Sequence, residues 1–229
     1  MGKRLLTLAL LLPALAACGS NGGETAGTTT TAVTTTAPAP PMALTVYRVD
    51  NGLLRPEVQH VPRTQAVASA SLHALGIDAS VTIADGTAKV DLEKPTQDEA
   101  AEIVYTLTQF ASVERVDVGG RSGLTRDDFA SYEPPILVET PASGADVGQT
   151  FRVAGRASVF EATLVVQLVR GGKVLQKQTV TASEGAPGRG TFETTLHGSP
   201  GEATVQAFSP SAADGSPQHE VDVAVSIRP

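Results

Sequence analysis

The dipeptide Pro134-Pro135 divides this chain of 229 residues into two stretches with different hydrophobic patterns. Before it, segments with helical spacing of apolar residues alternate with short strand-like segments; after it, only strand-like segments occur. Each proline removes a backbone donor and pushes the preceding residue out of helical space, so Glu133-Pro134-Pro135 is a short stiff joint. The pattern predicts a mixed α+β domain at residues 44–132 and an all-β domain at residues 136–229.

The N-terminal stretch contains two strand-like hairpins and two helix-like segments. Asn51-Gly52 and Asp85-Gly86 are strong signals for tight turns between strands. We expect strands at 44–50, 57–61, 81–84, 88–92 and 113–118, and a first helix at 64–75 that ends at Gly76.

A second helix, from Gln97 to Ala111, has the clearest signals. Thr96 and Glu99 form a capping box, in which each side chain binds the other residue's backbone N–H. One apolar stripe follows at helical spacing: Ala100, Ile103, Val104, Leu107 and Phe110. Helices interleaved with hairpins exclude an all-parallel sheet, so we expect two helices on one face of a small mixed sheet.

The C-terminal stretch shows seven strand signals in its 94 residues. They lie at 136–139, 150–156, 162–170, 173–181, 191–196, 203–208 and 221–227. Gly171-Gly172 and Asp214-Gly215 mark tight turns between them. Seven short strands in a domain of this size favour an immunoglobulin-like sandwich. The cysteine pair and core tryptophan of antibody domains are absent, so the strand count carries this prediction.

The N-terminus has the three parts of an export signal. Lys3 and Arg4 precede an apolar run at residues 5–12, and small residues lead to Cys18. The segment Leu-Ala-Ala-Cys resembles the lipid-attachment box of bacterial lipoproteins. That resemblance implies a signal peptide at 1–17, cleavage between Ala17 and Cys18, and acyl chains such as palmitate on Cys18. An ordinary signal peptide, with Cys18 a bystander, is the alternative.

Residues 18–43 consist mainly of Gly, Ser, Thr, Ala and Pro. Such a segment has almost nothing to bury, so we predict a disordered linker. Its mean reach would be about 25–30 Å. With a lipid on Cys18, the domains would stand off the extracytoplasmic face of the cell membrane, with the membrane itself as a partner.

Composition and charge exclude several kinds of chemistry. The formal net charge is −7, and −9 once the leader with Lys3 and Arg4 is removed, which disfavours nucleic acid as a partner. A single cysteine allows no intramolecular disulfide and no cysteine-based zinc site. The four histidines, His60, His73, His197 and His219, lack metal-ligand spacing. We therefore predict no metal and no cofactor.

Carboxylates are the only plentiful reactive groups. Paired carboxylates can divide into acid and base roles, so a peptidoglycan hydrolase using Asp or Glu is an alternative function. The candidates are Asp85, Asp91, Asp127, Asp128 and Glu161. The same carboxylates can also be explained as turn residues, as exposed residues on a strand surface or as helix caps. Ser122 is not a candidate nucleophile, because it lacks the Gly-x-Ser-x-Gly motif. We therefore predict no catalytic residue.

Two groups of motifs resemble known domains. The N-terminal motifs resemble the GerMN domain of sporulation and spore-germination proteins: Val46-Tyr47, Asp85 to Leu92, Ile103 to Phe110, and Val113 to Val118. The C-terminal motifs resemble the immunoglobulin-like domain of bacterial spore-germination proteins: Pro141, Gly144, Val153 to Ala157, Val159 to Ala162, and Gly190 to Glu193. The two domains often occur in this order.

Phe160 and Glu161 are the candidate interaction or motif residues of the second resemblance. In the favoured interpretation Phe160 fills the sandwich and Glu161 binds a neighbouring backbone turn. In the other, an exposed Phe160 beside Glu161 anchors a partner.

The sequence thus favours a lipid-anchored, non-enzymatic binding or scaffolding module of the cell envelope. The resemblance implies a link to sporulation, germination or cell-wall assembly, with an envelope protein or peptidoglycan as partner. A solute-binding lipoprotein is a further alternative, although such proteins usually have two larger α/β lobes.

Overall fold

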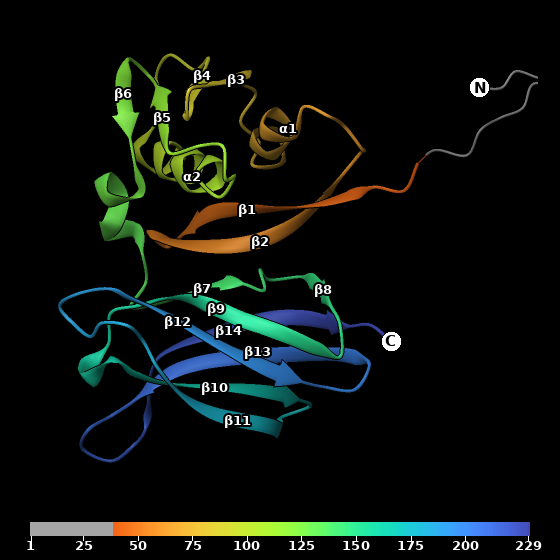
Figure 1. Ribbon diagram of the computed structural model, residues 1–229, viewed down its shortest axis with the longest axis vertical. Coiled ribbons are helices and arrows are strands. Elements are labelled where there is room, and N and C mark those ends of the chain that lie inside the picture. Colours follow the sequence, from red (N-terminus) through yellow and green to blue (C-terminus); the bar gives the residue numbers. More distant parts are fainter. Residues whose placement is uncertain (1–38) are drawn as a thin grey trace, which may run out of the picture. The chain divides into compact units, whose positions relative to one another are not determined.

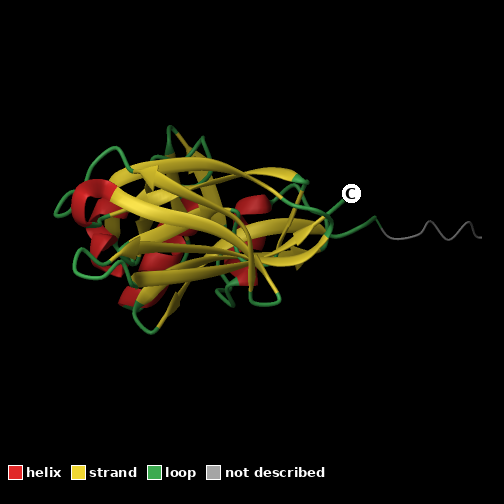
Figure 2. Ribbon diagram, turned by 90° about the horizontal axis from the view of Figure 1, so that it is seen from below, coloured by secondary structure: helices red, strands yellow, loops and turns green. Residues whose placement is uncertain are grey.

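The computed structural model describes residues 39–229, which form one compact unit. Ala17, Cys18 and most of the expected linker lie outside the described residues. Figure 1 shows an N-terminal region of two helices and two sheets beside an all-β sandwich. Strands make up most of the described chain (Figure 2). Within residues 39–229, no helix is both long and apolar enough to span a bilayer.

The N-terminal region contains the following elements: β1 (Met42–Asp50), β2 (Leu53–Val61), α1 (Val67–Ala74), β3 (Val81–Ala84), β4 (Thr87–Val90), α2 (Gln97–Leu107), β5 (Arg115–Val118), β6 (Arg121–Leu124) and the 3₁₀ segment η1 (Arg126–Tyr132). The order β3-β4-β5-β6 forms a mixed sheet, in which β4 and β5 are parallel. The predicted α+β class is confirmed.

The hairpin β1–β2 forms a separate two-stranded sheet, and this arrangement differs from the expected helices on one face. α2 packs against β1 on one side and β5 on the other, so the helices lie between the two sheets (Figure 1). One core cluster joins all three layers, with Leu54, Leu72, Ile103 and Val116 fully buried. Helical spacing alone could not reveal a second face of contact on α2.

Several predicted boundaries change. The turn at Asn51-Gly52 has left-handed φ angles of 51° and 77°, so β2 begins directly after it at Leu53 rather than at Glu57. α1 is shorter than the predicted 64–75, and α2 ends at Leu107 rather than Ala111. The capping box at Thr96 is confirmed: its Oγ1 accepts from Glu99 N at 3.1 Å. β5 begins at Arg115, and β6 was not predicted.

The C-terminal region contains these elements: β7 (Ile136–Thr140), β8 (Ala145–Val147), β9 (Thr150–Ala157), η2 (Phe160–Ala162), β10 (Thr163–Arg170), β11 (Lys173–Thr181), β12 (Gly190–His197), β13 (Gly201–Pro210) and β14 (Pro217–Ile227). Every predicted strand is present, and β8 is added. The predicted sandwich is confirmed.

The two sheets of the sandwich have the strand orders β12-β9-β7 and β11-β10-β13-β14-β8. β7 pairs antiparallel with β9, whereas β8 pairs parallel with β14, so the chain changes sheet between them. Val223, Val225 and Ile227 point into the core, as the alternation of β14 predicts. The β10–β11 hairpin turns at Gly171-Gly172, with φ angles of 55° and 76°.

Candidate functional site

The hairpin β1–β2 connects the N-terminal region to the sandwich through both of its edges. Along β1, side chains of α2 and of Gln109 just beyond its end bind the backbone: Val49 N donates to Glu102 Oε1, Tyr47 N to Thr106 Oγ1, and Gln109 Nε2 to Thr45 O. Four residues of helix rise about 6 Å and two of strand about 6.6 Å, so the two spacings match. Along β2, Val58 N donates to Ser143 O at 2.8 Å, and Ser143 N to Pro56 O at 3.0 Å.

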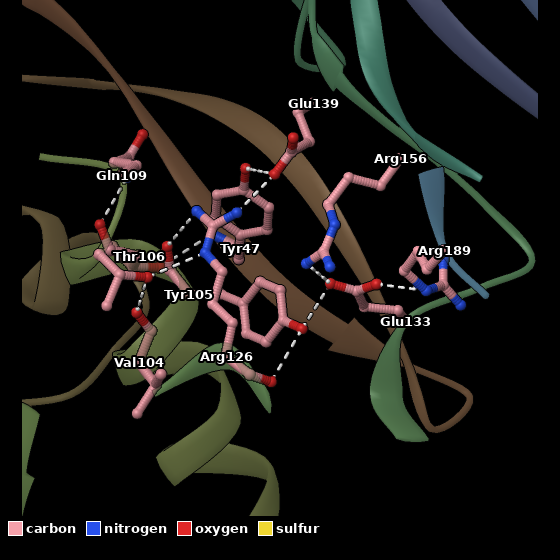
Figure 3. A network of polar contacts seen from close by, with 11 residues as sticks. Tyr47, Val104, Tyr105, Thr106, Gln109, Arg126, Glu133, Glu139, Arg156 and Arg189 are labelled. Atoms are coloured by element: carbon pink, nitrogen blue, oxygen red, sulfur yellow. Dashed lines mark hydrogen bonds and ion pairs between the residues drawn. The ribbon is translucent and has the colours of Figure 1, made fainter. Parts of the chain in front are cut away.

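Glu133 is the central anion of the junction between the two regions. Its side chain is 1% exposed, although it stands in the proline joint. Oε1 accepts from Tyr105 Oη at 2.7 Å and from Arg156 Nη1 at 2.8 Å. Arg189 Nε lies 2.7 Å from Oε2, in an ion pair whose N–H is not aligned as a hydrogen bond. Helix α2 and strand β9 thus meet on one carboxylate (Figure 3).

Arg126 and Glu139 form a second ion pair across the junction, with Nη1 and Oε1 2.5 Å apart. Tyr47 Oη donates to the same Glu139 oxygen at 3.2 Å. The guanidinium of Arg126 also lies 5.2 Å from the ring centre of Tyr47 and 4.9 Å from that of Tyr105. This arrangement combines ion-pair, hydrogen-bond and cation–π contacts around one arginine.

Both tyrosines of the junction remain protonated donors. Burial, with the negative charge of Glu139, raises the pKa of Tyr47. Burial and the hydrogen bond to Glu133 raise the pKa of Tyr105. Burial also raises the pKa of Glu102, whose carboxylate accepts from Val49 N.

An open polar pocket of about 690 Å³ lies beside this junction. Its lining combines hydroxyl, amide, carboxylate and guanidinium groups, drawn from β1, the end of α2, η1, β7 and β9. Arg126 and Glu139 reach it but are bound to each other. The pocket is lined by residues suited to bind polar groups, and the ion pairs beside it connect the two regions.

The junction residues were not predicted as a site. Tyr47, Tyr105 and Arg156 belong to the motifs that carry the two resemblances, and Glu133 to the proline joint. An acidic residue directly before two prolines, with arginines among otherwise apolar strand motifs, was the available signal. This signal does not identify the residues that bind the Glu133 carboxylate, because Arg156 and Arg189 are 23 and 56 residues away in sequence.

The predicted carboxylates are not brought together as an acid–base pair. Asp85, Asp91, Asp127 and Glu161 are exposed. Asp85 occupies its turn, as expected, with φ at 49°. Thr125 is the N-cap of η1, and its partner in the capping box is Asp128 rather than Asp127: Thr125 N donates to Asp128 Oδ2 at 2.8 Å.

The histidines likewise lie apart from one another. His73 Nε2 is 3.2 Å from Asp78 Oδ1, at an exposed position. Among residues 39–229, no group of three or more His, Cys, Asp or Glu side chains is arranged to hold a metal ion.

Phe160 does not fill the sandwich, so the favoured interpretation of this residue was wrong. Its side chain is 69% exposed. Glu161 and Ala162 have φ angles of 52° and 55°, a left-handed conformation that non-glycine residues rarely adopt. The neighbouring Val159 is the residue that points into the core, as do Phe151, Val153 and Ala157, so Phe160 projects to solvent.

Comparison with known families identifies the sandwich. Residues 135–216 match the immunoglobulin-like domain of bacterial spore germination, Gmad2. The match covers less than half of the chain, and it includes both Phe160 and Arg156. The matched domain coincides with the strands of the observed sandwich up to the turn before β14. A search of curated proteins found no match.

Two solved structures are similar at 16% sequence identity and a TM-score of 0.33 each. One is an engineered protein, with 59% of this chain and 37% of that chain covered. The other contains the tandem GerMN domains of the sporulation protein GerM from Bacillus subtilis, with 82% of this chain and 61% of that chain covered. The chain thus spans less than two thirds of either structure.

Proposed function

We propose that this chain is a non-enzymatic binding or scaffolding module of the cell envelope, working in sporulation, germination or cell-wall assembly. A lipid on Cys18 would hold it on the extracytoplasmic face of the membrane. The match of the sandwich to a spore-germination domain supports the process, and the leader sequence supports the location.

The exposed Phe160 is the observation that carries the binding role. A solvent-facing aromatic ring gains no stabilisation from burial in the core. The left-handed conformations of Glu161 and Ala162 cost about 1–2 kcal/mol each. Strain of this kind persists where the surrounding structure imposes it, and it concentrates at sites of function. Aromatic side chains are also enriched among the residues that dominate binding energy. Phe160 is therefore the proposed partner anchor, beside the exposed Glu161.

The ion-paired junction supports a scaffolding role. Because Glu133 binds groups from both regions and Glu139 of β7 binds Arg126 of the N-terminal region, a partner on the sandwich would be held in a fixed orientation to the N-terminal region. The linker predicted at residues 18–43, with a mean reach of about 25–30 Å, would then set how far this unit stands from the lipid.

The test is capture of partners from crosslinked membranes. The wild-type protein is compared with Cys18→Ala, Phe160→Ser and Val174→Ser, the last a control because Val174 is a 46% exposed apolar residue on β11. We expect one reproducible envelope partner, lost with Phe160→Ser and retained with Val174→Ser. Cys18→Ala should release the protein from the membrane fraction. Capture that is equal for Phe160→Ser and wild type would refute the anchor, and no reproducible partner would refute the binding role.

A further inference from the structure

Strand β14 has a free edge along its first half. It pairs with β13 over most of its length, but its other neighbour, β8, pairs only with residues 225–227. Gly144 N donates to Ala224 O at 2.8 Å, so the backbone of Ala224 points away from β13. Two residues earlier, Asp222 points the same way. No strand of the described chain pairs with that side of Asp222.

A groove of about 830 Å³ opens beside this edge. Three segments line it: the tip of the β1–β2 hairpin at 48–57, residues 134–138, and residues 219–223. Its apolar part includes Leu53, which is 38% exposed. The volume falls in the range of about 300–1,000 Å³ that is typical of ligand sites in proteins.

The opposite wall of the groove contains a second free edge. Ser158 N donates to Pro135 O at 2.8 Å, so the backbones of Ile136 and Val138 point away from β9. β7 has no other strand neighbour in the described chain. An extended segment in the groove would therefore lie between two strand edges.

The rim of the groove has uncompensated negative charge. Arg48 pairs with Glu57 at 2.9 Å, and Arg55 lies 3.6 Å from Asp50. These four charges balance. The remaining acids, Glu220 and Asp222, are exposed and form no ion pair among residues 39–229.

We propose that this groove binds an extended peptide segment of a partner protein, with alternating basic and apolar side chains, added as a strand to the free edge of β14. The inference rests on the proposed function in treating the chain as a binding module, but it uses a surface that does not include Phe160. Main-chain bonds to Asp222 would hold the segment, and alternate side chains would select it.

The alternation of basic and apolar side chains in the bound peptide follows from the two faces of β14. Basic side chains of the added strand would stand beside Asp222 and Glu220 on the outer face, since opposite charges stabilise cross-strand pairs. Apolar side chains would point inward beside Val221 and Val223. The opposing explanation is that the acids, with the left-handed His219 (φ 55°), only protect the edge from other strands.

The experiment uses the full-length protein and a fluorescent octapeptide of alternating Lys and Val. Anisotropy measures its affinity, and hydrogen exchange measures protection of the Asp222 amide. We expect the Lys-Val peptide to bind and to protect that amide, and a Glu-Val octapeptide to bind at least tenfold more weakly. Asp222→Pro removes the outward N–H but no bond to β13, and should weaken binding about tenfold. Asp222→Asn should weaken it about threefold.

Three variants serve as controls. Glu202→Gln, on β13 of the same sheet, should leave binding unchanged. Leu53→Ser replaces an exposed groove residue and should weaken binding even if Asp222→Pro fails to fold. Phe160→Ser should bind the peptide like wild type. No binding, equal binding of both peptides, or self-association through this edge would overturn the inference. Loss of partner capture by Phe160→Ser would still support the proposed function.

Discussion

Replacing Glu133 by Gln should destabilise the protein by about 3 kcal/mol. Two guanidinium groups, each about 4 Å from the carboxylate between charge centres, contribute about 4 kcal/mol each at an effective dielectric constant near 20. Removing the carboxylate from water costs several kcal/mol, and the neutral side chain recovers that cost. The lost ion-pair energy exceeds the recovered desolvation cost, so the free energy of unfolding falls. Gln also presents N–H groups to Arg189, which is itself a donor.

Urea unfolding with a matched control measures this loss. Glu193→Gln is the control, because Glu193 Oε2 also lies 2.7 Å from an arginine, Arg152 Nη2, but both side chains are more than half exposed. Water screens that pair, so no loss of unfolding free energy is expected. Arg189→Gln should then cost less in the Glu133→Gln background than in wild type. If Glu133→Gln loses no more stability than Glu193→Gln, the burial argument is wrong.

Three further predictions concern single side chains. Burial raises the folded-state pKa of Glu102, so the contribution of this residue to stability should fall as pH rises above about 4.3. Glu102→Gln should therefore gain stability relative to wild type between pH 4 and pH 7.5, and a stability difference that does not change with pH would contradict this. Thr96→Ala removes a helix cap and should cost about 1 kcal/mol, a melting-temperature loss of about 2–4 °C; an unchanged melting temperature would argue against the cap. Phe160→Ser should leave the melting temperature unchanged, whereas Phe192→Ala, in the core, should cost about 3–5 kcal/mol; equal losses would place Phe160 in the core.

Local patterns predicted most elements of the fold. The Thr96 cap and the turns at Asn51-Gly52 and Gly171-Gly172 each depend on residues that are close in sequence, and the structure confirms all three. The position of the β1–β2 hairpin was not predicted. It depends on side chains of α2 and of Gln109 just after it that bind the edge of β1, and these partners are 53 to 64 residues apart in sequence.

The interaction residues were predicted only in part. Phe160 and Glu161 stay predicted interaction residues, and the favoured role of Phe160 as a core residue was wrong. Phe151, Val153, Ala157 and Val159 are the inward residues of this segment, so the alternation itself places Phe160 on the outer side, and the left-handed backbone at 161–162 follows it. Such a conformation has no sequence signal without glycine.

The sequence by itself determined the α+β and all-β composition of the two stretches, and the attachment at Cys18 stays a prediction. These properties follow from local hydrophobic periodicity, turn residues and leader composition, which act over a few neighbouring positions. The tertiary structure decided that Glu133 is a buried anion between Arg156 and Arg189, and that β14 keeps a free edge. Both depend on which distant segments pack together, because a carboxylate can stay ionised in the interior only where packing supplies its counter-charges.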